Sequence, residues 1–230
     1  MTTPILLSWS GGKDCLMALL ALRADPTWDV VGLLTTITAR YDRISIHGVR
    51  CAVLQAQASA LGLPLIEARL DEPADNATYE RAHAAALQAA QARWPGLRHC
   101  AFGDLFLADV RSYREQQLAR AGWQAVFPLW GLPTGAMAHR FIGSGHRAMV
   151  VCVDTTQLAA FYCGHEFDAS FLTQLPAGVD PCGERGEFHT LSFSGPAFRA
   201  PVRLRSGTSV LRDGRFQYTD FELDDTPAVP

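Results

Sequence analysis

The sequence predicts an α/β protein, with a five-stranded parallel sheet covered by helices on both faces and a smaller α+β region towards the C-terminus. Apolar, β-rich runs alternate with longer helix-like segments over the first 130 residues. This order is typical of parallel strands joined by right-handed crossovers. After residue 130 the pattern changes to short β-rich runs separated by turn signals. We therefore expect one unit over residues 1–130 and a second over residues 131–230.

The first expected strand and helix enclose a glycine-rich turn. Residues 5–7 are apolar and suit a buried strand, residues 16–22 suit a buried helix, and residues 10–15 between them are Ser-Gly-Gly-Lys-Asp-Cys. Glycines allow the backbone to approach a ligand closely, and the free N–H groups at a helix N-terminus attract anions. Lys13 and the hydroxyls of Ser8 and Ser10 add donors. The turn predicts a phosphate-binding site, with an ordinary strand-to-helix bend as the alternative.

The other elements of the first unit follow in alternation. Strands are expected at residues 28–38, 64–70, 99–105 and 123–129, and helices at residues 49–61, 76–94 and 109–121. Residues 28–38 are almost continuously apolar or β-branched, which is typical of a parallel strand covered on both faces. Ligands of such sheets bind beyond the carboxyl ends of the strands. The site is therefore expected among residues 10–15, 35–47, 71–79 and 103–111.

The second unit is expected to mix helices with antiparallel strands. Helices are predicted at residues 134–142, with Thr134 as the cap, and at residues 167–175. Strands are predicted at residues 149–153, 188–193, 202–205, 209–211 and 216–221. Asp213 and Gly214 indicate a tight turn between the last two strands.

Composition excludes several classes of protein. Hydrophobic residues make up 48% and charged residues 19% of the 230 residues, as in ordinary globular proteins. The net charge of −3 argues against a broad nucleic-acid-binding surface, although a local basic groove stays open. No apolar run approaches the length of a membrane span, and no signal sequence precedes the first strand. The six cysteines are scattered, so we expect a cytoplasmic protein with reduced thiols and no zinc site.

A second group of candidate residues lies at positions 180–190, which read Asp-Pro-Cys-Gly-Glu-Arg-Gly-Glu-Phe-His-Thr. This is a glycine-rich turn with two carboxylates that leads into a strand. Glu184 and Glu187 are suited to bind a cationic substrate group, to orient ammonia or to hold Mg²⁺. The alternative is a solvated loop.

Together, these motifs resemble the diphthine–ammonia ligase (diphthamide synthase) family of the PP-loop ATP pyrophosphatases, or adenine nucleotide alpha-hydrolase-like proteins, which have the HUP type of fold. The likeness rests on the Ser-Gly-Gly-Lys-Asp turn, on Glu-x-Gly-Glu-Phe at residues 184–188 and on Gly-Pro-x-Phe at residues 195–198. It spans roughly residues 5–200. Three positions depart from the pattern. Cys15 replaces a serine, Arg185 replaces a glycine and His189 replaces a glutamate.

The resemblance implies an AMP-forming ligase. Such an enzyme activates a carboxylate by attack on the α-phosphate of ATP, which releases pyrophosphate, and ammonia then displaces AMP to leave an amide. The implied cofactors are ATP and Mg²⁺. The implied partners are ammonia, or another amine, and a carboxylate-bearing acceptor on a protein side chain or a small molecule. The acceptor and the oligomeric state stay open, with a homodimer among the alternatives.

The resemblance also assigns the candidate residues to four sets. The catalytic set is Lys13, Asp14, Glu184 and Glu187. The ATP-binding set is Ser8, Ser10, Gly11, Gly12, Lys13, Asp14, Cys15, Thr35, Thr36, Ile37, His47, Gly103 and Asp104, with the adenine expected near residues 35–37. The acceptor-side set is Asn76, Tyr79, Glu80, Arg111, Glu115, Glu184 and Glu187. The expected Mg²⁺ ligands are Asp14 and Asp104.

Several alternatives remain beside these roles. Cys15 is either a replacement for a hydroxyl donor or a nucleophile at a helix N-terminus. Arg111 and Glu115 are spaced as a surface ion pair, or else contact the substrate. For the whole chain, a non-catalytic nucleotide-binding sensor and an ATP-dependent RNA-modifying enzyme are the alternatives to a ligase.

Overall fold

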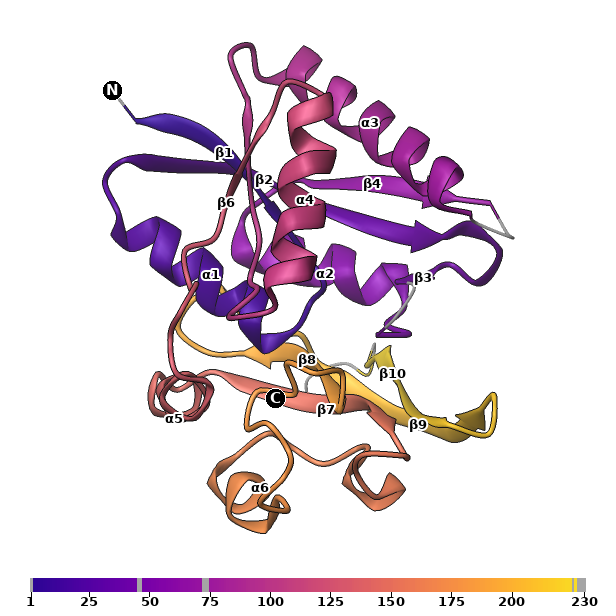
Figure 1. Ribbon diagram of the computed structural model, residues 1–230. Helices are drawn as coiled ribbons and strands as arrows, with labels where there is room; N and C mark the ends of the chain where they lie inside the picture. Colours follow the sequence, from indigo (N-terminus) through magenta and orange to yellow (C-terminus); the bar gives the residue numbers. More distant parts are fainter. Residues whose placement is uncertain (1, 45–46, 72–74, 225, 227–230) are drawn as a thin grey trace.

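The computed structural model describes residues 2–44, 47–71, 75–224 and 226, and shows two sheets (Figure 1). The first sheet contains five parallel strands in the order β4-β2-β1-β5-β6. Their bounds are Thr3–Ser8 (β1), Trp28–Thr38 (β2), Leu65–Leu70 (β4), His99–Ala101 (β5) and Gln124–Val126 (β6). The predicted parallel sheet is confirmed. Residues 45–46 and 72–74, which belong to two of the expected rim segments, lie outside the described residues.

A short antiparallel strand, β3 (Arg43–Ile44), pairs with the last two residues of β2. No sequence pattern indicated it, because two residues are too few to show a period. The expected strands at residues 99–105 and 123–129 are shorter than predicted, and their last residues form the loops at the rim of the sheet.

Helices cover both faces of the first sheet, as predicted. Ile5 and Leu7 belong to one hydrophobic cluster with the buried residues of α1 and α2, whereas Leu6 belongs to another with those of α3 and α4. Successive strand residues point to opposite faces, so the apolar run of β1 is buried only if both faces are covered. The helices span Lys13–Ala24 (α1), Cys51–Leu61 (α2), Asn76–Arg93 (α3) and Ala108–Arg120 (α4).

The second sheet is antiparallel, with the strand order β8-β7-β10-β9. Its strands span Arg147–Asp154 (β7), Phe188–Ser194 (β8), Leu204–Arg212 (β9) and Phe216–Leu223 (β10), and its helices span Thr134–Gly143 (α5) and Ala169–Gln174 (α6). Two 3-10 turns lie at Ala39–Tyr41 and Ala160–Tyr162. The predicted α+β character of this region is confirmed, although the two segments expected at residues 202–211 form one strand.

Two local predictions in this region have opposite outcomes. The turn at Asp213 and Gly214 is confirmed, because both residues have positive φ angles, 51° and 61°. The prediction that Thr134 caps α5 is wrong. Pro133 is the capping residue, and the Thr134 hydroxyl donates to Asp180 instead, at 2.8 Å.

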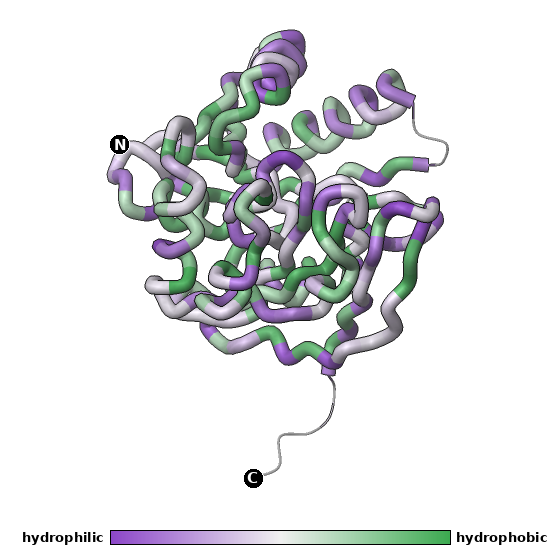
Figure 2. Tube along the Cα trace, turned by 60° about the horizontal axis from the view of Figure 1, so that its bottom comes forward, coloured by the Kyte–Doolittle hydropathy of each residue, from purple (hydrophilic) through white to green (hydrophobic). Residues whose placement is uncertain are grey.

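The second sheet lies against the α1 and α2 side of the first sheet (Figure 1), and one hydrophobic cluster runs from β1 through these helices to β7 and β8. The cluster crosses the expected boundary at residue 130, so the division into two units stays a prediction. Hydrophilic and hydrophobic residues alternate along the trace (Figure 2). Within the part of the chain that the structure describes, no helix is long and apolar enough to cross a membrane.

Two polar contacts fix the second sheet to the glycine-rich turn. β8 is an edge strand, so its outer side has backbone groups that are free to pair. The Ser192 N–H donates to the Gly11 carbonyl at 2.8 Å, and the Lys13 N–H donates to the Thr190 hydroxyl at 3.0 Å. The turn is therefore held by residues that lie about 180 positions away in the chain.

Candidate functional site

A cavity of about 310 Å³ lies at the carboxyl ends of β1 and β5, where the loop before β8 covers it. Nine residues of the predicted sets line it: Ser8, Ser10, Lys13, Asp14, Cys15, His47, Gly103, Asp104 and Glu184. Arg114, Cys182, His189 and Thr190 also line it, although no sequence pattern indicates a role for them. The cavity combines the turn of the first unit with the second acidic motif.

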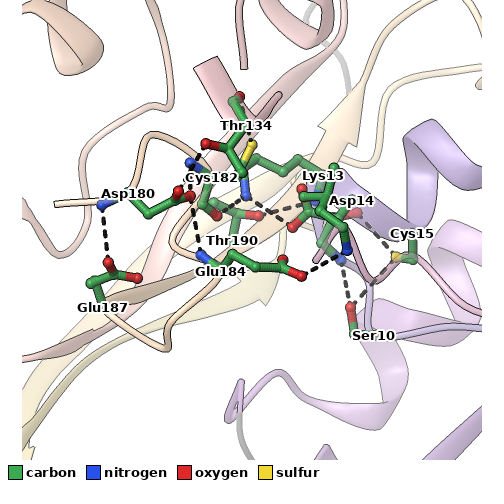
Figure 3. Close-up of polar contacts among 12 residues, drawn as sticks. Ser10, Lys13, Asp14, Cys15, Thr134, Asp180, Cys182, Glu184, Glu187 and Thr190 are labelled. Carbon is green, nitrogen blue, oxygen red and sulfur yellow. Dashed lines mark hydrogen bonds and ion pairs between the residues drawn. The ribbon is translucent and has the colours of Figure 1, made fainter. Parts of the chain in front are cut away.

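Lys13 lines the cavity and is only 2% exposed. Its ammonium group donates to Asp14 Oδ2 at 2.9 Å and to the Cys182 carbonyl. It also lies 5.2 Å from the centre of the Phe167 ring and 5.3 Å from that of Phe188. Burial by itself lowers the pKa of Lys13, but the Asp14 carboxylate and Cys182 raise it above the ordinary value. The side chain is therefore a buried cation, shown beside Asp14 in Figure 3.

The shape of the turn depends on Gly11 and on a glutamine from α2. Gly11 has a φ of +82°, and a Cβ at this position would lie 2.9 Å from the side chain of Gln57. The Gln57 amide group donates to the carbonyls of Gly11 (3.0 Å) and Ser192 (2.5 Å), and its oxygen accepts from the Trp9 indole (3.0 Å). Gln57 thus joins the turn to β8. Nothing in an alanine-rich helix indicated this role.

Cys15 is a buried thiol rather than a reactive one. Its Sγ donates to the Gly12 carbonyl at 3.0 Å and accepts from the Ser10 hydroxyl at 3.5 Å. Burial raises the pKa of Cys15 to about 11, so the thiol stays protonated at neutral pH. A thiolate is the nucleophilic form. This geometry favours the hydroxyl-replacement alternative for Cys15 over covalent catalysis.

Glu184 reaches into the cavity from the opposite wall. Its carboxylate accepts from the Leu105 N–H at 2.7 Å and points towards the turn that carries Lys13 and Asp14 (Figure 3). Burial raises the pKa of Glu184 to about 7, and the neighbouring carboxylates of Asp14 and Asp104 act in the same direction. A carboxyl group with such a pKa is suited to exchange protons near neutral pH.

The acidic residues of the cavity fit Mg²⁺ to different degrees. Asp14 Oδ1 is a buried oxygen without a hydrogen-bond partner in the described structure, so it is available to a metal ion. Asp104 instead forms an ion pair with Arg114, at 2.9 Å. The described residues contain no cluster of three or more metal-binding side chains. Mg²⁺ is usually held by one or two carboxylates together with phosphate oxygens and water, and Asp14 suits that mode.

Glu187 lies outside the cavity although it is only three residues from Glu184. It is 2% exposed, and its two oxygens accept from the N–H groups of Asp180 and Arg185, both at 2.9 Å. These bonds hold the loop that carries Glu184 and Cys182, and Figure 3 shows the one between Asp180 and Glu187. The geometry gives Glu187 a positioning role, and its catalytic role stays a prediction.

The residues expected near adenine also lie away from the cavity wall. Thr35, Thr36 and Ile37 are inside β2, where they pair with β4. Thr35 and Ile37 are buried, with exposed fractions of 2% and 0%. The placement of adenine beside these residues stays a prediction.

The acceptor-side candidates on α3 and α4 are not among the cavity-lining residues either. Asn76 is exposed at the start of α3, Tyr79 stacks on His83, and Glu80 pairs with Arg120 at 3.4 Å. Arg111 pairs with Glu115 at 2.8 Å and lies over the rings of Phe127 and Trp130, 4.9 and 4.7 Å from their centres. This arrangement favours the surface ion pair over a substrate contact for Arg111 and Glu115.

Comparison with known proteins identifies the family. The family models described as the diphthamide synthase N-terminal domain and the diphthamide synthase C-terminal domain match residues 3–113 and 134–216. No curated protein matches the chain. A similar solved structure is a predicted subunit of tRNA methyltransferase from Methanocaldococcus jannaschii. It is 15% identical with a TM-score of 0.44, and the match covers 87% of this chain and 100% of that one. That likeness is too weak to bear on function. The two family matches cover well over half of the residues, so the chain belongs to the diphthamide synthase family.

Proposed function

We propose that this protein is an ATP-dependent ligase that adenylates a carboxylate, releases pyrophosphate, and amidates the adenylate with ammonia or another amine. One observation carries the proposal. The glycine-rich turn with Lys13 and the acidic side chain of Glu184 come from different halves of the chain and meet in one cavity. Membership of the diphthamide synthase family supports an enzyme of this class.

The turn and the start of α1 are suited to hold the pyrophosphate part of ATP. Helix N-termini attract phosphate groups, and Lys13 supplies a cation. An ammonium group has three N–H donors, and Asp14 and Cys182 take two of them within the described residues. The third is left for a phosphate oxygen. Donors that are already in place act where negative charge develops on the leaving pyrophosphate.

Glu184 is suited to serve the second half of the reaction. As the amine nitrogen bonds to the acyl carbon, the bond from that carbon to the AMP oxygen breaks and the nitrogen loses a proton. The Glu184 carboxylate would accept this proton, since its pKa of about 7 lies near the working pH. Mg²⁺, when bound, would supply positive charge at the phosphate oxygens beside Asp14.

The test is a turnover assay with ATP, Mg²⁺, ammonium and a panel of carboxylic acids and carboxylate-bearing peptides. We expect AMP and pyrophosphate in equal amounts, and ¹⁸O from a labelled carboxylate should appear in the AMP phosphate. Tight ATP binding without AMP release over the whole panel would support a sensor instead. AMP release that requires RNA would support RNA modification.

A further inference from the structure

His47 and His189 are two cavity residues whose placement the proposed reaction has not yet used. Their rings stack with centroids 4.4 Å apart and planes inclined by 25°. His47 comes from the segment between β3 and α2, and His189 comes from β8, so the pair joins the two halves of the chain. Both side chains line the same cavity as the glycine-rich turn.

His47 lies directly beside that turn. A Cβ built on Gly12 would lie 3.4 Å from Cε1 of the His47 ring. The ring nitrogen Nδ1 of His47 is buried and has no hydrogen-bond partner within the described residues. Arg43 and Arg50, on either side of His47 in the chain, bond to Asp220 of β10 at 2.7 and 2.5 Å. Residues on either side of His47 are thus tied to β10, and the ring itself has a nitrogen without a partner beside the expected phosphate position.

The charges of the cavity leave a polyphosphate poorly neutralised. The charged side chains that line it in the described structure are two cations, Lys13 and Arg114, and three carboxylates, Asp14, Asp104 and Glu184. Each cation already forms an ion pair with a carboxylate. A triphosphate carries several negative charges, and Mg²⁺ offsets only part of them. Beyond the N-terminus of α1, lining groups that are neutral before the nucleotide binds can supply further positive charge.

We propose that His47 and His189, the imidazole pair, supply this positive charge. They form a second phosphate-binding element, which becomes cationic when the polyphosphate of ATP enters the cavity. The inference rests on the proposed use of ATP and adds two phosphate-binding groups to it.

The electrostatics of the free protein agree with this switch in charge. Burial lowers the pKa of His47 well below its ordinary value, and the neighbouring His189 and Lys13 lower it further. Burial, together with Lys13, lowers the pKa of His189 to about 4. Two stacked imidazolium rings repel each other, but an anion within about 4–6 Å favours the charged form and raises such pKa values by about 1–3 units.

Other titratable groups face the pair and have to be separated from it in a test. On the turn and α1 they are Lys13, Asp14 and Cys15, and around the remaining cavity wall they are Asp104, Arg114, Cys182 and Glu184. On the outer side of His47 they are Tyr41, Arg43, Arg212, Tyr218 and Asp220. Glu184 is the main competitor, because its pKa of about 7 also lies near neutrality.

The experiment measures proton uptake on nucleotide binding. Mg²⁺ and α,β-methylene-ATP, which cannot be cleaved between the α- and β-phosphates, are titrated calorimetrically into the protein at about pH 6 in two buffers of different ionisation enthalpy. We expect uptake of about one proton per nucleotide. The affinity should weaken as the pH rises, because the protein binds the nucleotide more tightly when the pair is protonated. Adenosine, which has no phosphate, should bind without uptake.

Matched variants identify the group that takes up the proton. His189→Gln and His47→Gln should each abolish most of the uptake and weaken nucleotide binding by about tenfold or more, since one pKa unit equals a tenfold difference. Glu184→Gln should keep the uptake. Imidazole ¹⁵N shifts of the unaltered protein, with and without the nucleotide analogue, report the protonation directly and do not depend on how well a variant folds.

Each outcome decides between the two proposals. Binding without uptake, no binding at all, or uptake that is lost only in Glu184→Gln overturns the imidazole pair. Binding without uptake leaves the ligase intact if AMP is still formed from ATP. Uptake by the pair without AMP release in the turnover assay overturns the ligase and retains the phosphate-binding element.

Discussion

Lys13 and Glu184 show, at the residue scale, how burial gives ordinary side chains their chemical properties. Lys13 remains a cation inside the protein because Asp14 and the Cys182 carbonyl surround its ammonium group. Glu184 keeps a proton up to about neutral pH because burial disfavours its carboxylate. The sequence predicted both residues for the site, but it also predicted Glu187, whose carboxylate holds its own loop. Two glutamates three positions apart cannot be distinguished by residue type alone.

Lys13→Met should lower AMP-forming turnover by about 10²-fold or more, because removing one preorganised donor to a developing charge costs roughly 3 kcal/mol. Methionine keeps an apolar stem against Phe167 and Phe188. Steady-state AMP release measures the effect. Arg111→Met is the matched control, since this surface cation lies outside the cavity and its loss should change turnover by about twofold at most. Full activity in Lys13→Met would remove Lys13 from the phosphate site.

The pH dependence of turnover should report the ionisation of the Glu184 carboxyl group. Its raised pKa of about 7 means that the carboxyl group is protonated below this pH and ionised above it. If the carboxylate accepts the proton of the amine, turnover rises as the pH passes through about 7. Glu184→Gln should remove this rise and lower turnover by about 10²–10⁴-fold.

Glu187→Gln is the control for that pH profile. It should keep the rise near pH 7 while lowering the melting temperature, because it disturbs two buried bonds to the loop backbone. A profile of Glu184→Gln with the same rise as the unaltered protein would show that another group titrates there.

At the scale of elements, the site depends on how closely the start of α1 approaches the end of β5. Gly103 follows β5, and a Cβ built on it would lie 2.9 Å from the Asp14 carbonyl carbon and 3.0 Å from the Asp14 carbonyl oxygen. The sequence indicated a rim position for Gly103, because it follows an expected strand. It did not indicate why glycine is required, since the atoms that would clash belong to a helix about 90 residues earlier.

Gly103→Ala should weaken ATP binding by about tenfold or more, because backbone cannot move aside as a flexible side chain does and the start of α1 must shift. Calorimetry with α,β-methylene-ATP measures the change. Gly135→Ala in α5 is the control: nothing lies within 4 Å of its added Cβ. It should bind ATP normally and gain about 0.5–1 kcal/mol of stability. Equal affinities of the two variants would contradict the close-approach explanation.

At the scale of the whole molecule, Gln57 connects three parts that are far apart in the sequence. It is fully buried, and it bonds Trp9 after β1, Gly11 in the turn and Ser192 on β8. One side chain thereby fixes the turn against the edge of the second sheet. The docking of the two sheets and the shape of the glycine-rich turn therefore depend on the same side chain.

Gln57→Leu should lower the free energy of unfolding by about 2–4 kcal/mol, since it leaves buried donors and acceptors without partners in a site of nearly unchanged volume. It should also weaken ATP binding, because Gly11 loses its support. Urea denaturation and calorimetry measure the two effects. Gln55→Leu, in the same helix but with its bond to Glu67 exposed to solvent, should change stability by about 0.5 kcal/mol or less. A Gln57→Leu protein with unchanged stability and normal ATP affinity would contradict the role of Gln57 in joining the turn to β8.

The sequence by itself determined the order of the strands and helices, the parallel sheet, and the glycine-rich turn before α1, because hydrophobic period and turn chemistry are properties of neighbouring residues. Its motifs also indicated the family that the comparison with known proteins identified. Only the tertiary structure decided that Glu184 faces the cavity while Glu187 does not, that Gln57 supports the turn, and that His47 stacks on His189. These contacts depend on how the second sheet docks against α1 and α2. No local pattern encodes contacts between residues that docking alone brings together.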